Sequence, residues 1–108
     1  MKELSTQDEL NSVFAEEIAV LYKHSTRCPI SAGANEKLEG LLARHPDAPI
    51  YKVDVHAARD LSHSIVERTG VEHQSPQVIV LRRGEPAWTR ARMEISAEEV
   101  AEQLDAPA

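Results

Sequence analysis

The pattern of apolar and polar residues in the first quarter of the chain predicts one helix and one strand. Apolar residues recur on one helical face of residues 5–15, behind a capping-box pattern at its start. The continuous apolar run at residues 18–22 is typical of a short strand that is covered on both faces. We expect the polar residues 23–24 to end this strand.

A strand–helix–strand unit and a third helix are predicted in the middle of the chain. A helix starts at Pro29 and stops at residues 45–47, and the alternating segment 49–55 predicts a second strand. Because a helix joins the two strands, we expect them to be parallel. A third helix contains Leu61 and Ile65 and ends near residues 69–70, where a glycine suits a left-handed cap.

The last third of the chain predicts an antiparallel hairpin and a final helix. Residues 78–81 and 86–89 are strand-like and flank a turn that contains a glycine. Ser96 and Glu99 then have capping-box spacing. The order αβαβαββα predicts one α/β domain over residues 1–108, with a four-stranded mixed sheet flanked by helices.

Charge and hydropathy exclude several classes of partner. The 108 residues carry a formal net charge of −6, which opposes binding to nucleic acid or to an anionic membrane surface. The first twenty residues are too acidic for a secretory signal, and no run is long enough to cross a membrane. We therefore expect a cytoplasmic protein, in a compartment where free thiols persist.

Cys28 is the single cysteine of the chain, so redox chemistry at this residue requires an external thiol. The five histidines form no pair with metal-ligand spacing, and we predict no metal site. His24 and His73 are interpreted as solvent-exposed. The basic residues Arg82, Arg83, Arg90 and Arg92 are interpreted as a solvated face, with binding of a dianionic ligand as the alternative.

The position of Cys28 at a predicted helix start favours a reactive thiolate. With Cys28 at the N-cap, Pro29 takes the first helical position, and the amides of Ile30 and Ser31 face the sulfur. These donors and the helix dipole lower a thiol pKa, and the Ser31 hydroxyl and Arg27 add a possible hydrogen bond and a cation. The alternative is that Cys28 is a small buried apolar residue.

Two strings in the sequence resemble the monothiol bacilliredoxins, which are thioredoxin-like proteins of the bacillithiol system. They are residues 23–31 (KHSTRCPIS) and residues 72–77 (EHQSPQ), and the order of elements is similar to the thioredoxin superfamily over nearly the whole chain. The resemblance implies a thioredoxin-like fold. It also implies a monothiol oxidoreductase in which Cys28 removes bacillithiol from protein mixed disulfides.

The resemblance also assigns roles to other residues. Ser31 stands where a dithiol enzyme has its resolving cysteine, so a second low-molecular-weight thiol must release the adduct. Ser75–Pro76 is expected to be a cis bond beside Cys28, with the preceding backbone free to pair with a substrate strand. Arg27 departs from the family's pattern, in which we expect a smaller polar residue. Among the cations near the sulfur, which are Arg27, Lys23 and His24, we favour Arg27 as the contact for the two carboxylates of bacillithiol. Bacillithiol is then a co-substrate rather than a bound cofactor, and bacillithiolated proteins are the partners.

Two alternatives place the protein among binding modules. A glutaredoxin-like iron–sulfur carrier also uses a cysteine at a helix start, and brown colour after anaerobic purification would favour it. A thioredoxin-fold adaptor has an incidental cysteine, which resists alkylation in the native state.

Overall fold

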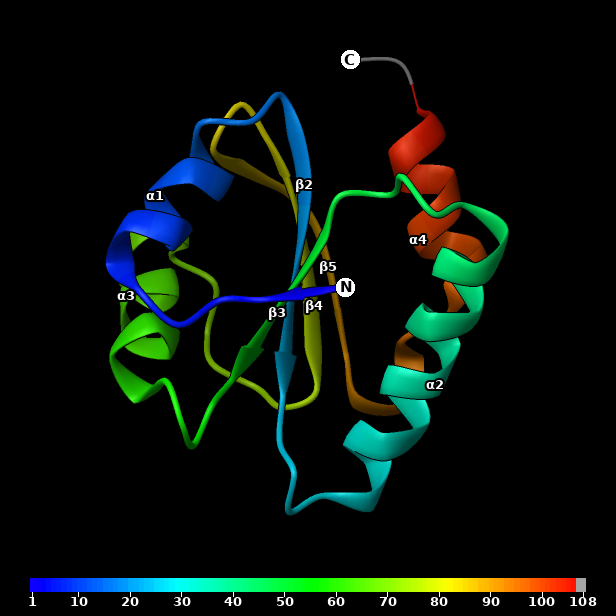
Figure 1. The fold of residues 1–108 in the computed structure, drawn as a ribbon, viewed down its shortest axis with the longest axis horizontal. Coiled ribbons are helices and arrows are strands. Elements are labelled where there is room, and N and C mark those ends of the chain that lie inside the picture. The colour runs from blue at the N-terminus through cyan, green and yellow to red at the C-terminus, as the bar shows by residue number, and fades with distance from the viewer. Residues whose placement is uncertain (107–108) are drawn as a thin grey trace.

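A mixed five-stranded sheet lies between two layers of helices in the computed structural model, which describes residues 1–106 (Figure 1). Helices α1 and α3 cover one face, and α2 and α4 cover the other. The elements in chain order are β1 (Lys2–Glu3), α1 (Gln7–Phe14), β2 (Ile18–His24), α2 (Pro29–Arg44), β3 (Ile50–Asp54), α3 (Arg59–Thr69), β4 (Gln77–Arg82), β5 (Glu85–Ala91), a 3₁₀ helix (Arg92–Glu94) and α4 (Ala97–Asp105).

The sheet order β1-β3-β2-β4-β5 places β2 at its centre. Strand β2 pairs in parallel with β3 and antiparallel with β4, as the sequence predicts for a strand–helix–strand unit followed by a hairpin. The predicted number of four strands is wrong, because β1 adds a fifth by pairing in parallel with β3. Two exposed residues are too short for a hydrophobic pattern, so only the pairing partner defines this strand.

Strand β2 also runs past its predicted end. Lys23 and His24 pair with Val53 and Asp54 of β3, and Lys23 pairs on its other side with Gln77 of β4. Both residues are buried, although their polarity indicated a strand end. The prediction that His24 is exposed is therefore wrong, whereas His73 is exposed as expected.

The predicted local signals at element ends are present. The Thr6 side chain accepts a hydrogen bond from the Glu9 amide in a reciprocal capping box, and the Ser96 side chain accepts one from the Glu99 amide. Gly70 caps α3 with a left-handed φ of 71°. In the hairpin turn, Gly84 has a φ of 79°, and a Cβ built there would lie 2.8 Å from the Phe14 carbonyl oxygen.

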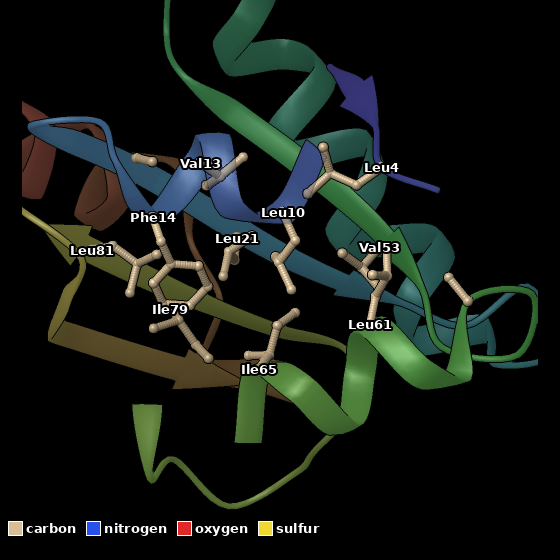
Figure 2. Packing of buried hydrophobic residues seen from close by; sticks show 12 residues of the cluster. Leu4, Leu10, Val13, Phe14, Leu21, Val53, Leu61, Ile65, Ile79 and Leu81 are labelled. Atoms are coloured by element: carbon tan, nitrogen blue, oxygen red, sulfur yellow. The ribbon is translucent and has the colours of Figure 1, made fainter. Parts of the chain in front are cut away.

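Two apolar clusters, one on each face of the sheet, hold the layers together. Figure 2 shows the first, in which α1 and α3 pack on the sheet through residues such as Leu10, Phe14 and Ile65. Consecutive β2 residues alternate between the clusters: Leu21 belongs to the first, and Tyr22 to the second under α2 and α4. Burial on both faces explains why the sequence of β2 is continuously apolar rather than alternating.

Candidate active site

Cys28 lies at the N-cap of α2, immediately after the loop that leaves the central strand. Its backbone is extended, with φ −120° and ψ 121°, and Pro29 occupies the first turn of the helix. The Cys28 carbonyl accepts hydrogen bonds from the amides of Ser31 (3.0 Å) and Ala32 (3.3 Å). The residue is partly exposed, so its sulfur can meet a reagent from solvent. The interpretation of Cys28 as a fully buried apolar residue is therefore excluded.

The surroundings of the sulfur favour the thiolate. The backbone N–H of Ser31 has the largest effect in lowering the pKa of the Cys28 thiol, and the Ile30 amide and the Ser31 hydroxyl act in the same direction. Arg92 adds a favourable charge, while partial desolvation opposes these effects. The Cys28 pKa is thus lowered mainly by donors at the start of the helix, as expected for a nucleophilic cysteine.

Ser31 fixes the start of α2 to the end of β2. This residue is fully buried, and its hydroxyl oxygen accepts a hydrogen bond from the Ser25 amide over 3.2 Å. Its carbonyl oxygen accepts one from the Tyr22 hydroxyl over 2.9 Å, and that hydroxyl also lies 2.7 Å from Nδ1 of His24. This buried network holds the backbone that carries the amide donors to Cys28.

The Ser75–Pro76 peptide bond is cis, and it lies at the same end of the sheet as Cys28. The next residue, Gln77, pairs with Lys23 near the end of β2, which leads into the Cys28 loop. Arg92 contacts this segment twice. Its backbone N–H donates to the Pro76 carbonyl over 2.8 Å, and its Nη1 donates to the Ser75 carbonyl over 3.0 Å.

The charge of Arg92 lowers the pKa of the Cys28 thiol, a role that the sequence suggested for Arg27. The Arg27 side chain is exposed, and its backbone N–H donates to the Ser25 hydroxyl over 3.2 Å. Arg92 has a left-handed φ of 56°, a backbone conformation that is uncommon for residues other than glycine. The sequence showed Arg92 only as part of a basic run, because nothing local indicates that the chain returns to Cys28 there.

The structure brings together most of the site residues expected from the sequence. Cys28, Pro29 and Ser31 form one helix start, and Ser75–Pro76 lies at the same end of the sheet. Sequence reasoning named Lys23 and His24 only as candidate cations, and it missed that both are buried behind the site together with Tyr22. Their signal was the polar end of an apolar strand, which we interpreted as the strand's end.

Two further expectations concern metals and membranes. Within residues 1–106, no group of three or more His, Cys, Asp or Glu side chains has the placement to hold a metal ion. No helix in the same part of the chain has the length and hydropathy to cross a membrane.

The arrangement supports one-cysteine chemistry. A partly exposed thiol with a lowered pKa has the nucleophilic character that attack on a disulfide sulfur requires. With serine at position 31 and no second cysteine in the sequence, the protein cannot release this adduct by itself.

Comparison with known proteins agrees with this geometry. A solved structure described as having a thioredoxin fold is 32% identical in sequence, with a TM-score of 0.88 over 96% of this chain and 93% of that chain. Two thioredoxins share the fold. Oxidised thioredoxin from Plasmodium falciparum is 18% identical, with a TM-score of 0.79 over 98% of this chain and 99% of that chain. Thioredoxin from Fasciola hepatica is 17% identical, with a TM-score of 0.74 over 96% of each chain. The sequence model of the monothiol bacilliredoxin BrxC family matches residues 2–100. The protein has a thioredoxin fold and belongs to the monothiol bacilliredoxin family of thiol redox proteins.

Proposed function

We propose that the protein removes bacillithiol from protein mixed disulfides by one-cysteine thiol–disulfide exchange, in the cytoplasm. The observation that carries this proposal is the helix start at Cys28. One thiol meets the amides of Ile30 and Ser31, and a buried serine occupies the position of a resolving cysteine. Membership of the monothiol bacilliredoxin family supports bacillithiol as the co-substrate.

The first step transfers bacillithiol from the client protein to Cys28. The Cys28 thiolate attacks the bacillithiol sulfur of the mixed disulfide, and the client cysteine leaves as a thiolate. A new disulfide forms as the old one breaks, so no net oxidation occurs. Protons from water or buffer neutralise the client thiolate according to its pKa. The lowered pKa of Cys28 raises the thiolate fraction available near neutral pH.

The second step regenerates Cys28. A low-molecular-weight thiol, as its thiolate, attacks the bacillithiol sulfur bound to Cys28 and leaves with it as a soluble disulfide. The Cys28 thiolate is released and the cycle closes. Because the chain contains one cysteine, the rate of this step depends on the concentration of the external thiol.

Intact mass spectrometry tests the proposal directly. A bacillithiolated client is mixed with the protein, and wild type should gain one bacillithiol while the client loses it. The Cys28→Ser variant should leave the client modified. The same client carrying glutathione measures preference for the thiol. If the client kept bacillithiol in the presence of wild type, or if native Cys28 resisted alkylation, the proposal would be wrong and the adaptor alternative favoured.

A further inference from the structure

A pocket lined by nitrogen donors lies beside the loop that precedes Cys28. It has a volume of about 340 Å³ and is formed by α3, the segment after β3 and the segment before β4. Four lining side chains carry nitrogen donors, namely His56, Arg59, His63 and His73. Among residues 1–106, no Asp or Glu lines this pocket, although the whole chain has a net charge of −6. The pocket lining therefore carries one guanidinium and no carboxylate, in a chain that is acidic overall.

Lys23 lies on the sheet face that forms the floor of this region. It pairs with Val53 on β3 and with Gln77 on β4, and paired residues in neighbouring strands point to the same side. Val53 packs in the cluster under α3, and Val55, two residues further along, lines the pocket. The register therefore directs the Lys23 side chain toward α3 and the pocket.

The Lys23 ammonium group lacks a partner. It is fully buried, and its Nζ donates no hydrogen bond to any acceptor within residues 1–106. Burial lowers its pKa to about 8. The pKa of His73, which lines the pocket, is lowered first by partial desolvation of its ring and then by the charges of Lys23 and His63. A buried cation without an acceptor is destabilising, and an anion beside it would relieve that cost.

The pocket is connected to the reactive cysteine through one residue. The His56 side chain lines the pocket, and its Nε2 lies 3.0 Å from the Ser25 hydroxyl. The Ser25 carbonyl in turn accepts a hydrogen bond from the Cys28 amide over 3.4 Å. The pocket therefore borders the loop that carries Cys28, on the side of Ser25.

We infer that this pocket binds a carboxylate group of the disulfide that reacts with Cys28, with Arg59 and the three histidines as its donors and the charge of the buried Lys23 adding to their attraction. The inference rests on the proposed exchange chemistry and adds a specificity site to it. It assigns carboxylate recognition to this pocket instead of to the exposed Arg27. The carboxylate belongs either to the low-molecular-weight thiol or to an acidic side chain beside the client cysteine, and the two sources are separable by experiment.

Exchange rates with two small disulfides test the inference. Dithiodiglycolic acid carries carboxylates and hydroxyethyl disulfide is neutral, and formation of the Cys28 adduct is followed by intact mass. Arg59→Gln should slow the reaction with the dicarboxylate by about five-fold, the size expected for an exposed charge contact, and leave the neutral reaction unchanged. Arg44→Gln at the end of α2 removes the same charge elsewhere and should change neither rate.

Peptide disulfides separate the two sources of carboxylate. A peptide with Glu beside its cysteine is compared with its Gln counterpart, both as mixed disulfides with cysteamine, which carries no carboxylate. Faster reaction with the Glu peptide, lost in Arg59→Gln, assigns the pocket to clients. Equal rates for the two peptides, together with the dicarboxylate effect, assign it to the small thiol.

A direct binding measurement tests the pocket independently of the exchange reaction in the proposed function. Titration with succinate should shift the ring NMR signals of His56, His63 and His73 in wild type, and much less in Arg59→Gln. Absence of these shifts would overturn the pocket even where exchange is fast. Shifts without any exchange would retain the pocket as an anion site and reject the proposed reaction.

Equal slowing of both small disulfides by Arg59→Gln would also overturn the inference, because the charge would then act on the thiolate.

Discussion

The guanidinium of Arg92 donates a hydrogen bond to the carbonyl oxygen of Ser75 over 3.0 Å. The same residue helps to lower the pKa of Cys28, so one side chain connects the proline segment with the reactive sulfur. It does so from a left-handed backbone conformation with a φ of 56°. Uncommon backbone conformations of this kind concentrate at functional sites, where the surrounding structure maintains them.

Replacing Arg92 by glycine should weaken the thiolate without unfolding the protein. Glycine adopts the left-handed conformation readily, which offsets the lost hydrogen bond to Ser75. We expect the Cys28 pKa to rise and alkylation at neutral pH to slow by up to about five-fold, since the charge is solvent-exposed. Alkylation rate against pH is the measurement. Arg27→Gln is the comparison, and an equal effect there would show that general charge, not Arg92, tunes the thiol.

Replacing Ser31 by cysteine should convert the protein to dithiol chemistry. The new thiolate lies on the same helix start and attacks Cys28 of the mixed disulfide, forming an internal disulfide and expelling the bound thiol. Intact mass should show loss of the adduct without added thiol. Ser31→Ala is the control, and its adduct should persist as in wild type. Persistence of the adduct in the cysteine variant would place positions 28 and 31 out of reach of each other.

Lys23→Met should stabilise the protein in a pH-dependent manner. Burial lowers the Lys23 pKa from 10.5 to about 8, so below pH 8 the folded protein holds a charged group that it disfavours. This costs roughly 3 kcal/mol of unfolding free energy, which the methionine variant avoids. Between pH 8 and 10.5 the folded lysine loses its proton before the unfolded one does, so wild type gains stability and the difference shrinks.

Urea unfolding at several pH values, in buffer without carboxylates, measures this difference. The pKa of His73 supplies a check, because it should rise when the Lys23 charge is removed. A constant gain in stability across the pH range would show that apolar packing, rather than removal of a buried charge, explains the effect.

Gly84→Ala should destabilise the hairpin turn. The position has a φ of 79°, and the added Cβ would lie 2.8 Å from the Phe14 carbonyl oxygen in the neighbouring helix. Strain and overpacking together predict a loss of about 2 kcal/mol or more in unfolding free energy. Gly40→Ala in α2 is the matched control, because a Cβ there meets nothing within 4 Å and should stabilise the helix by about 0.5–1 kcal/mol. Equal effects of the two substitutions would contradict this account.

Sequence reasoning succeeded where a local pattern specifies local structure. The capping pairs at Thr6 and Ser96 and the helix start at Pro29 lie where the pattern predicted them. It failed where distant residues decide the outcome. Strand β1 exists through its pairing with β3, and Lys23 is buried because strands and α3 surround it. Arg92 reaches the thiol only after the hairpin returns the chain to the same edge.

The placement of β2 has a consequence for how the site moves. This strand is hydrogen-bonded on both sides and covered on both faces, so its amides should be among the slowest in the molecule to exchange with deuterium. The two-residue β1 and the outer strand β5, at the opposite edges, should exchange far sooner. Cys28 therefore follows the strand that unfolds last. The amide donors around its sulfur should stay in place when the outer strands β1 and β5 unfold transiently.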